Sequence, residues 1–106
     1  MDNLSSTLGA LSHPSRRAIL DRLTRGPARV TEIAEPFDMS LNAVSKHLKV
    51  LESAGLIRRE VVGRDHVIEF RGAPLREVST WVRHYERFWT QELDKLDHYF
   101  KAKRNK

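Results

Sequence analysis

Residues 40–57, SLNAVSKHLKVLESAGLI, carry the pattern that decides the fold. At about 100° per residue, three apolar side chains share one stripe of a helix: Val44, Leu48 and Leu51. The opposite side gathers polar and cationic side chains: Asn42, Ser45, Lys46 and Lys49. Ser40 suits the N-cap because its hydroxyl can accept a hydrogen bond from a first-turn amide, and Gly55 suits the stop because glycine readily adopts the left-handed conformation. We predict an amphipathic helix over residues 40–54.

The polar side of this helix has two interpretations. The simpler interpretation is a solvated face, because any exposed helix has a polar side. The residue types favour a binding surface, because two lysines can neutralise phosphates while Asn42 and Ser45 are short enough to reach base edges. Upstream, residues 30–40 supply a short apolar-periodic segment and then a tight polar turn. A helix, a short turn and an amphipathic helix form the helix-turn-helix arrangement, in which the second helix enters a major groove.

Downstream, the sequence predicts a β-hairpin. Residues 56–62 and 66–70 are rich in β-branched and aromatic side chains and flank a Gly-Arg-Asp turn. Gly63 permits the positive φ that a tight turn needs, so Arg64 would stand at or beside the tip.

The flanking segments predict three further helices. Asn3 to Leu11 carries leucines at helical spacing, and Pro14 suits the first position of a second helix that ends at Gly26-Pro27. Pro36 lies late in a short third helix, where its missing amide shortens the last turn.

The second helix carries several arginines, each of which could equally contact a phosphate or lie on a solvated surface: Arg16, Arg17, Arg22 and Arg25. Two neighbouring arginines of the first hairpin strand must point to opposite faces, so at most one faces the same partner as the tip: Arg58 or Arg59.

The longest periodic segment, residues 75–100, predicts a last helix that exceeds its own domain. Twenty-six residues at 1.5 Å each extend about 39 Å, longer than the diameter of a domain of this size. We expect it to pack with the first helix against a second copy of the chain; the alternative is a long helix folded over its own core. The expected dimer-interface residues are Leu4, Leu8, Leu11, Val82, Tyr85, Trp89, Leu93 and Leu96.

Composition limits the possible functions. The chain has 106 residues, so we predict one domain, 1–106, and its net charge of +5 with a pI near 10.0 favours a polyanionic partner. Without cysteine, disulfides and thiolate metal sites are excluded. No apolar run approaches the roughly 18 residues of a membrane span and the N-terminus lacks a signal-peptide pattern, so we expect a cytoplasmic protein. The sequence shows no phosphate-binding loop, no activated nucleophile and no paired carboxylates, so we do not expect an enzyme.

The motifs resemble those of the ArsR-type winged helix-turn-helix transcriptional regulators, and within them a cysteine-free subgroup. The resemblance covers about residues 4–100 and is carried by LSHPSRRAILDRL at 11–23, by VTEIAEPFDMSLNAVSKHLKVLESAGLIRRE at 30–60 and by the Gly-Arg turn. It implies a mainly α fold with five helices and a two-stranded wing. It also implies a homodimer, built on the first and last helices, that binds an imperfect inverted repeat and represses transcription.

The chain departs from the metal-sensing members of that family. Their thiolate motif would fall in the third helix, which has no cysteine, and the spacing of their last-helix zinc site is not reproduced. Asp94 and His98 lie at i, i+4 and could share a metal with a partner chain, but an ordinary surface pair is the default. We therefore predict no metal and no cofactor.

The leading hypothesis is a dimeric repressor that reads the major groove with helix 40–54 and the minor groove or backbone with the wing near Gly63-Arg64. The expected DNA-binding residues are Ser40, Asn42, Ser45, Lys46, His47, Lys49 and Arg64. His47 lies near the core stripe, so a packed histidine bonded to backbone is an equal alternative.

Two questions stay open. The competing function is a winged-helix module that binds another protein through its apolar stripe, with an incidental basic face. An effector could be a small apolar ligand, a partner protein, a proton on a histidine, or absent. An aromatic cluster of the last helix could line a ligand pocket, although such stripes are usually core: Trp81, Tyr85, Phe88 and Trp89.

Overall fold

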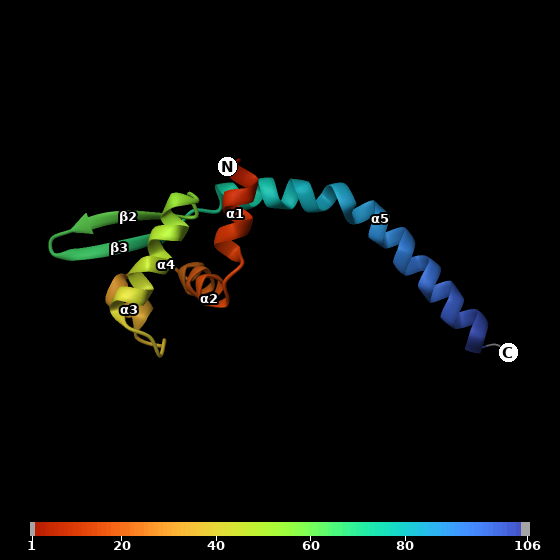
Figure 1. Cartoon of the computed structure of the whole chain (residues 1–106), viewed down its shortest axis with the longest axis horizontal. Helices are drawn as coiled ribbons and strands as arrows, with labels where there is room; N and C mark the ends of the chain where they lie inside the picture. The colour runs from red at the N-terminus through yellow and green to blue at the C-terminus, as the bar shows by residue number, and fades with distance from the viewer. Residues whose placement is uncertain (1, 105–106) are drawn as a thin grey trace.

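The elements of the chain follow the predicted order in a computed structural model that describes residues 2–104 (Figure 1). The helices are α1 (Asn3–Leu11), α2 (Pro14–Leu23), α3 (Val30–Ala34), α4 (Leu41–Ser53) and α5 (Ala73–Arg104). The strands are β1 (Ala28–Arg29), β2 (Ile57–Val62) and β3 (Asp65–Phe70). The prediction of a mainly α fold with five helices and a wing is confirmed.

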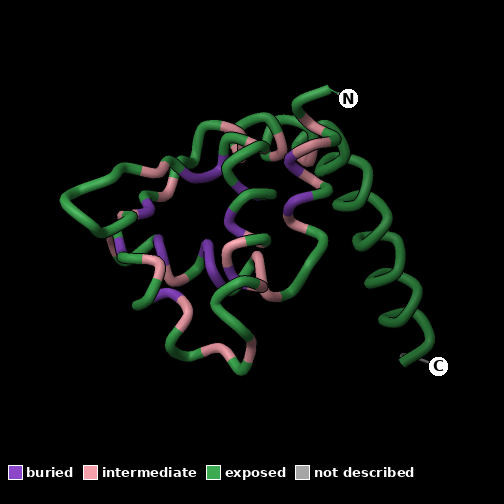
Figure 2. Tube along the Cα trace, turned by 60° about the vertical axis from the view of Figure 1, so that its left-hand side comes forward, coloured by how far each residue is buried: buried purple, intermediate pink, exposed green. Residues whose placement is uncertain are grey.

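The elements from α1 to β3 form a globular part, which we call the head, and every one of them contributes at least one buried side chain to its core. Apolar side chains with no exposed area come from α2, α3, α4, the sheet and the turn that precedes it: Ile19, Ile33, Val44, Leu48, Leu51, Leu56 and Ile68. Figure 2 shows the buried segments gathered within the head, away from the last helix. The head therefore holds the core of the chain.

Helix α4 begins and ends within one residue of the predicted bounds. The Oγ of Ser40 accepts a hydrogen bond from the backbone N–H of Ala43 at 3.1 Å, which is the expected N-cap. Gly55 follows the helix with a φ of 77°. Helix α3 ends two residues before Pro36, as a proline requires, and the turn that follows fixes where α4 starts.

The wing is the predicted hairpin of β2 and β3, with Val62 opposite Asp65 across a two-residue turn. Gly63 has a φ of 64°, whereas Arg64 has no positive φ, which fits a type II′ turn. The sheet has a third strand that the sequence did not predict: β1 pairs with β3, giving the order β1-β3-β2. A two-residue strand is too short to show an alternating pattern.

Helix α5 is longer than predicted, and its 32 residues correspond to about 48 Å. It packs beside α1 and then leaves the head, so the longest dimension of the chain is 69 Å (Figure 1). None of its residues is buried. Despite its length, charges interrupt α5 so often that neither it nor any other helix within residues 2–104 is apolar enough to cross a membrane.

Candidate nucleic-acid interface

Helix α4 separates its two sides as predicted. Its apolar stripe is fully buried against the head. On the opposite side Asn42, Lys46 and Lys49 are exposed and Ser45 is half-buried. The helix therefore presents cations and short polar side chains to solvent while its back is held by packing.

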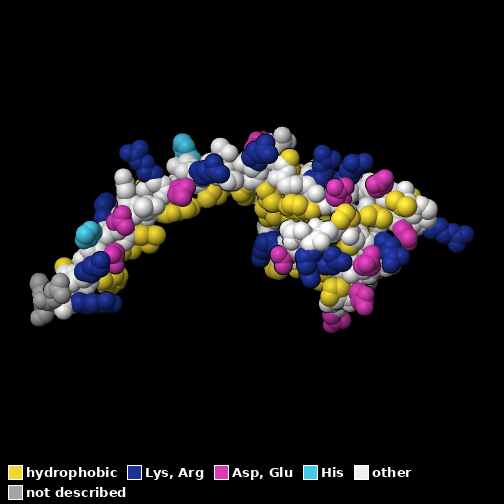
Figure 3. Space-filling view, turned by 180° about the vertical axis from the view of Figure 1, so that it is seen from behind, with side chains coloured by type: hydrophobic (Ala, Val, Ile, Leu, Met, Phe, Trp, Pro, Cys, Tyr) yellow, Lys and Arg dark blue, Asp and Glu magenta, His cyan; other side chains and the backbone are white. Residues whose placement is uncertain are grey.

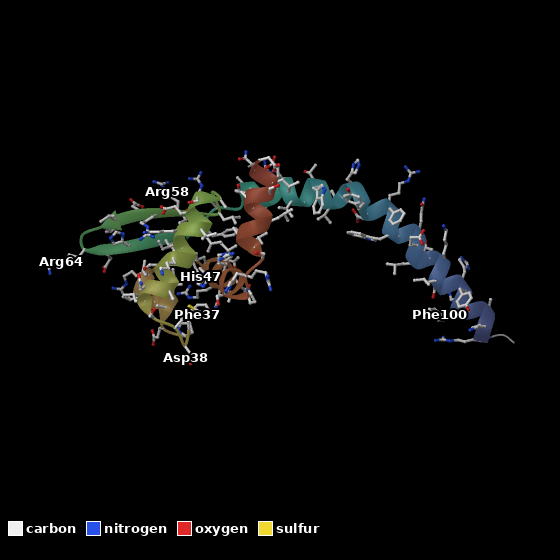
Figure 4. The ribbon with its side chains drawn as sticks, in the orientation of Figure 1. Phe37, Asp38, His47, Arg58, Arg64 and Phe100 are labelled. Carbon is white, nitrogen blue, oxygen red and sulfur yellow. The ribbon has the colours of Figure 1, made fainter. Side chains whose placement is uncertain are left out.

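Ser45 shares a crevice of about 330 Å³ with the wing. This wing crevice lies between α3, the start of α4 and the hairpin, and its lining includes Leu41, Ser45, Arg64, Arg29, Arg59 and His66. The structure thus brings together two predicted site residues that lie far apart in the sequence, Ser45 and Arg64. Figure 4 shows Arg64 at the far end of the hairpin, reaching away from the head.

The wing crevice is also lined by basic side chains that were not among the predicted site residues, Arg29 and His66, and by Arg59, which was one of two alternatives. Arg29 bonds the Oε1 of Glu32 at 3.0 Å and lies 3.7 Å from Asp65. The bond to Glu32, and then the charges of Glu32 and Asp65, raise the pKa of Arg29 above its usual value. Arg59 lies 3.3 Å from the Nδ1 of His66.

Strand alternation predicted that only one of two neighbouring arginines would lie on the side of the tip's partner, and the structure shows which one. Arg58 and Arg59 do face opposite sides: Arg59 lines the wing crevice, whereas Arg58 lines another cavity beside Arg71. Arg29 comes from a separate segment that only the sheet brings close, so no local pattern indicates it.

Lys49 lies apart from the wing crevice. It lines a second groove, of about 380 Å³, between α1 and α4, with Val50 and Ser53 from α4 and Ser5 and Gly9 from α1. A phosphate that contacts Lys49 would therefore lie on the α1 side of α4, and one that contacts Arg64 would lie on the wing side.

In the protein without DNA, the side chain of His47 points toward α2. Its Nδ1 lies 3.4 Å from Nη1 of Arg16, and its ring centroid lies 4.5 Å from that of His13. Burial of the ring, followed by the charges of His13 and Arg16, lowers the pKa of His47. The ring is thus packed, as one of the two alternatives proposed. Its Nδ1, however, contacts a side chain and not the backbone.

The predicted dimer residues fall into two groups. The leucines of α1 and Val82 are half-buried. The distal residues of α5 are about half exposed: Tyr85, Trp89, Leu93 and Leu96. Figure 3 shows hydrophobic side chains along the concave side of α5, continuing onto the head. A single chain therefore leaves one long apolar strip in solvent.

The proposed aromatic pocket has a partial counterpart. A cavity of about 770 Å³ lies where α1, the end of α4 and the start of α5 meet, and Trp81 lines it together with Leu4 and Pro74. Tyr85, Phe88 and Trp89 lie farther along α5 and are not part of that lining. Within residues 2–104, no three histidine or acidic side chains come together as metal ligands would.

Comparisons with known proteins agree with this geometry. A family model described as a helix-turn-helix domain matches residues 11–60. The HTH-type transcriptional regulator Rv2034 of Mycobacterium tuberculosis is 39% identical over 79% of this chain and 76% of that protein.

Solved structures are similar over a comparable length. The ArsR family transcriptional regulator RHA00566 is 40% identical with a TM-score of 0.77, covering 83% of this chain and 91% of that one. The homodimeric winged helix-turn-helix DNA-binding domain Mb0332 of Mycobacterium bovis, a possible ArsR-family regulator, is 25% identical with a TM-score of 0.66, covering 86% and 84%.

Proposed function

The chain belongs to the ArsR family of winged helix-turn-helix transcriptional regulators, and from this premise we propose that it is a homodimeric repressor that reads DNA with α4 and the wing. The observation that carries the proposal is the exposed, cationic side of α4 together with the wing crevice, where Ser45 of that helix meets Arg64. Similar proteins are transcriptional regulators, and none of the three above is described as an enzyme.

In this proposal the side chains of α4 divide the work of binding. Asn42 and Ser45 read base edges in the major groove, while Lys46 and Lys49 neutralise phosphates. Ser40 presents its hydroxyl at the N-terminus of the helix, where the helix dipole also favours a phosphate. Arg64 enters or borders the minor groove, and Arg29, Arg59 and His66 add positive or polar groups behind it.

The dimer would cover the strip that one chain leaves exposed. Monomers seldom expose contiguous apolar patches of more than a few hundred Å², so an aromatic strip along a helix of about 48 Å indicates a partner. The proposed interface joins α1 to α5 through Leu4, Leu8 and Leu11 and the stripe of α5. The homodimer described for the M. bovis domain supports the same assembly here.

Two-fold symmetry then determines the operator. Two copies of α4 related by a two-fold axis meet two half-sites in opposite orientation, so the target would be an imperfect inverted repeat. A dimer seated on such a site within a promoter would repress by excluding other proteins from the duplex. Binding to chromosomal DNA would place the protein in the cytoplasm.

The test is a salt titration of DNA binding. Fragments bound by the purified chain are selected from a random duplex library, and the affinity for the enriched sequence is measured between 50 and 200 mM salt. For about six or more neutralised phosphates, affinity should fall by at least about 10³ over that range. An absence of DNA binding at low salt would instead favour the protein-interaction module, whose basic face is incidental.

A further inference from the structure

The C-terminal end of α1 is held by two arginines from α2. Helix α1 has no basic residue in its last turn. Arg16 donates from Nε to the carbonyl of Ala10 at 2.6 Å and from Nη2 to that of Gly9 at 3.1 Å, and Arg17 donates to Leu11 at 2.7 Å. These carbonyls lie in the last turn of α1, at the negative end of its dipole, and that of Gly9 also accepts from the backbone N–H and the Oγ of Ser12 at 3.2 and 2.6 Å. Neither arginine is therefore a merely solvated side chain.

Arg16 makes one contact that Arg17 does not. Its remaining nitrogen, Nη1, lies 3.4 Å from Nδ1 of His47 on α4. A guanidinium holds five N–H donors in one rigid plane, so a single group bonds α1 and α4 at once. His13 supports the same contact from the other side, with its ring 4.5 Å from that of His47 and its own Nδ1 capping α2 through the N–H of Ser15 at 3.1 Å.

We propose that Arg16 is a positioning residue that fixes the angle of α4 against α1, with the ring of His47 as its contact on α4. This rests on the proposed function, in which α1 belongs to the dimer interface and α4 reads DNA. Helix α4 has 13 residues and is about 20 Å long, so a tilt of 10° about its C-terminus moves its N-terminus by about 3 Å. A displacement of that size breaks base contacts, whose hydrogen bonds tolerate a few tenths of an ångström.

The contact needs an unprotonated acceptor on His47. The titratable and charged side chains that face its ring are His13 and Arg16 from α2, and residues 3–11 of α1 carry no ionisable side chain. Both groups oppose a proton on the ring, as does its burial, so Nδ1 stays free to accept at neutral pH. In mild acid a protonated ring would repel Arg16 and release α4.

The first experiment measures the spacing of the two α4 helices without DNA. The chain has no cysteine, so Leu41→Cys at the exposed start of α4 provides one spin-label site per subunit. Arg16→Lys keeps the charge but loses the planar fork. It should broaden the label-to-label distance distribution and shift it by up to about 6 Å, because a 10° tilt moves the label of each subunit by about 3 Å. Arg17→Lys, the matched control, should leave the distribution unchanged.

A pH series separates positioning from a general loss of structure. As the pH falls through the lowered pKa of His47, the labelled Leu41→Cys protein with no further substitution should approach the Arg16→Lys distribution, and Arg16→Lys itself should change little. His47→Phe, which keeps a ring but removes the acceptor, should reproduce the shift of Arg16→Lys, and combining the two should add nothing. Unchanged distances in Arg16→Lys, or equal shifts in Arg16→Lys and Arg17→Lys, would overturn the inference.

The second experiment measures affinity with the selected operator and with random duplex DNA. Arg16→Lys should weaken operator binding about tenfold, the scale of one hydrogen bond to a charged group, while random-duplex binding changes less than twofold because the charge is retained. Equal losses on both DNAs would make Arg16 a phosphate contact and reject positioning. If label distances respond to Arg16 but no DNA is bound at low salt, the proposed function fails while the positioning role stands; if no inter-subunit distance is found at any concentration, both fail.

Discussion

The head and α5 use the same kinds of apolar side chain in opposite ways. In α4 the stripe formed by Val44, Leu48 and Leu51 has no exposed area, whereas no residue of α5 is buried. Both stripes recur at steps of three or four residues. Periodicity therefore indicates that a helix has an apolar side, but it does not indicate whether that side meets the same chain or another one.

The largest expected effect comes from a charge in the α5 stripe. Leu93→Lys would bury an unpaired ammonium group twice in a symmetric dimer. At about 2 kcal/mol for each copy, the dimer dissociation constant should rise about 10³-fold, and operator affinity should fall with it. Gln91→Lys adds the same charge outside the stripe of the same helix and serves as the control. Sedimentation at several concentrations checks both; equal dimer affinity in the two variants would contradict the α5 interface.

The next effect should be confined to the head. Leu48→Ala removes a fully buried side chain and should lower the free energy of unfolding by about 2–5 kcal/mol. Val50→Ala, on the exposed side of the same helix, should cost less than about 1 kcal/mol. Urea unfolding of both variants at one protein concentration measures the difference. Similar losses would mean that Val50 is covered in the dimer.

The exposed side of α4 should show a smaller and sequence-dependent effect. Asn42→Ala should cost about 1–3 kcal/mol at one base pair and relax the preference there, whereas Lys49→Ala should weaken binding to all sequences alike. Affinities for matched and singly mismatched operators separate the two. Uniform loss in both variants would remove Asn42 from base reading.

The smallest effect is the pH dependence of His47. Because the folded state lowers its pKa, the unfolded chain binds more protons between that lowered pKa and about 6.5, so stability falls as the pH drops through this window. His47→Phe should flatten that part of the profile. Chemical unfolding from pH 7.5 to 5 tests this, and an unchanged slope would assign the loss to other histidines.

Local patterns predicted most of the fold. The N-cap Ser40, the stop at Gly55 and the turn at Gly63 are each short-range signals, and each occurs where it was expected. Strand β1 was missed because it has two residues, and the length of α5 was underestimated because Gly72-Ala73-Pro74 resembles a turn and residues 101–104 are mostly basic.

The site was less predictable where several segments meet. Arg16 carries no local sign that it would bond α1 and α4 together, and Arg29 reaches the wing crevice through a strand pairing that the sequence did not indicate. Such contacts depend on how helices pack and not on the pattern of any one helix. The roles of the predicted DNA-binding and dimer residues remain predictions for the measurements above.

The exposed strip of α5 makes the regulator sensitive to its own abundance. If pairing of the strips assembles the DNA-binding unit, then below the dimer dissociation constant the concentration of that unit rises with the square of the subunit concentration. A twofold change in synthesis would then alter the supply of active protein fourfold. The solvent-facing aromatic residues of one helix would thus set the dose at which the promoter responds.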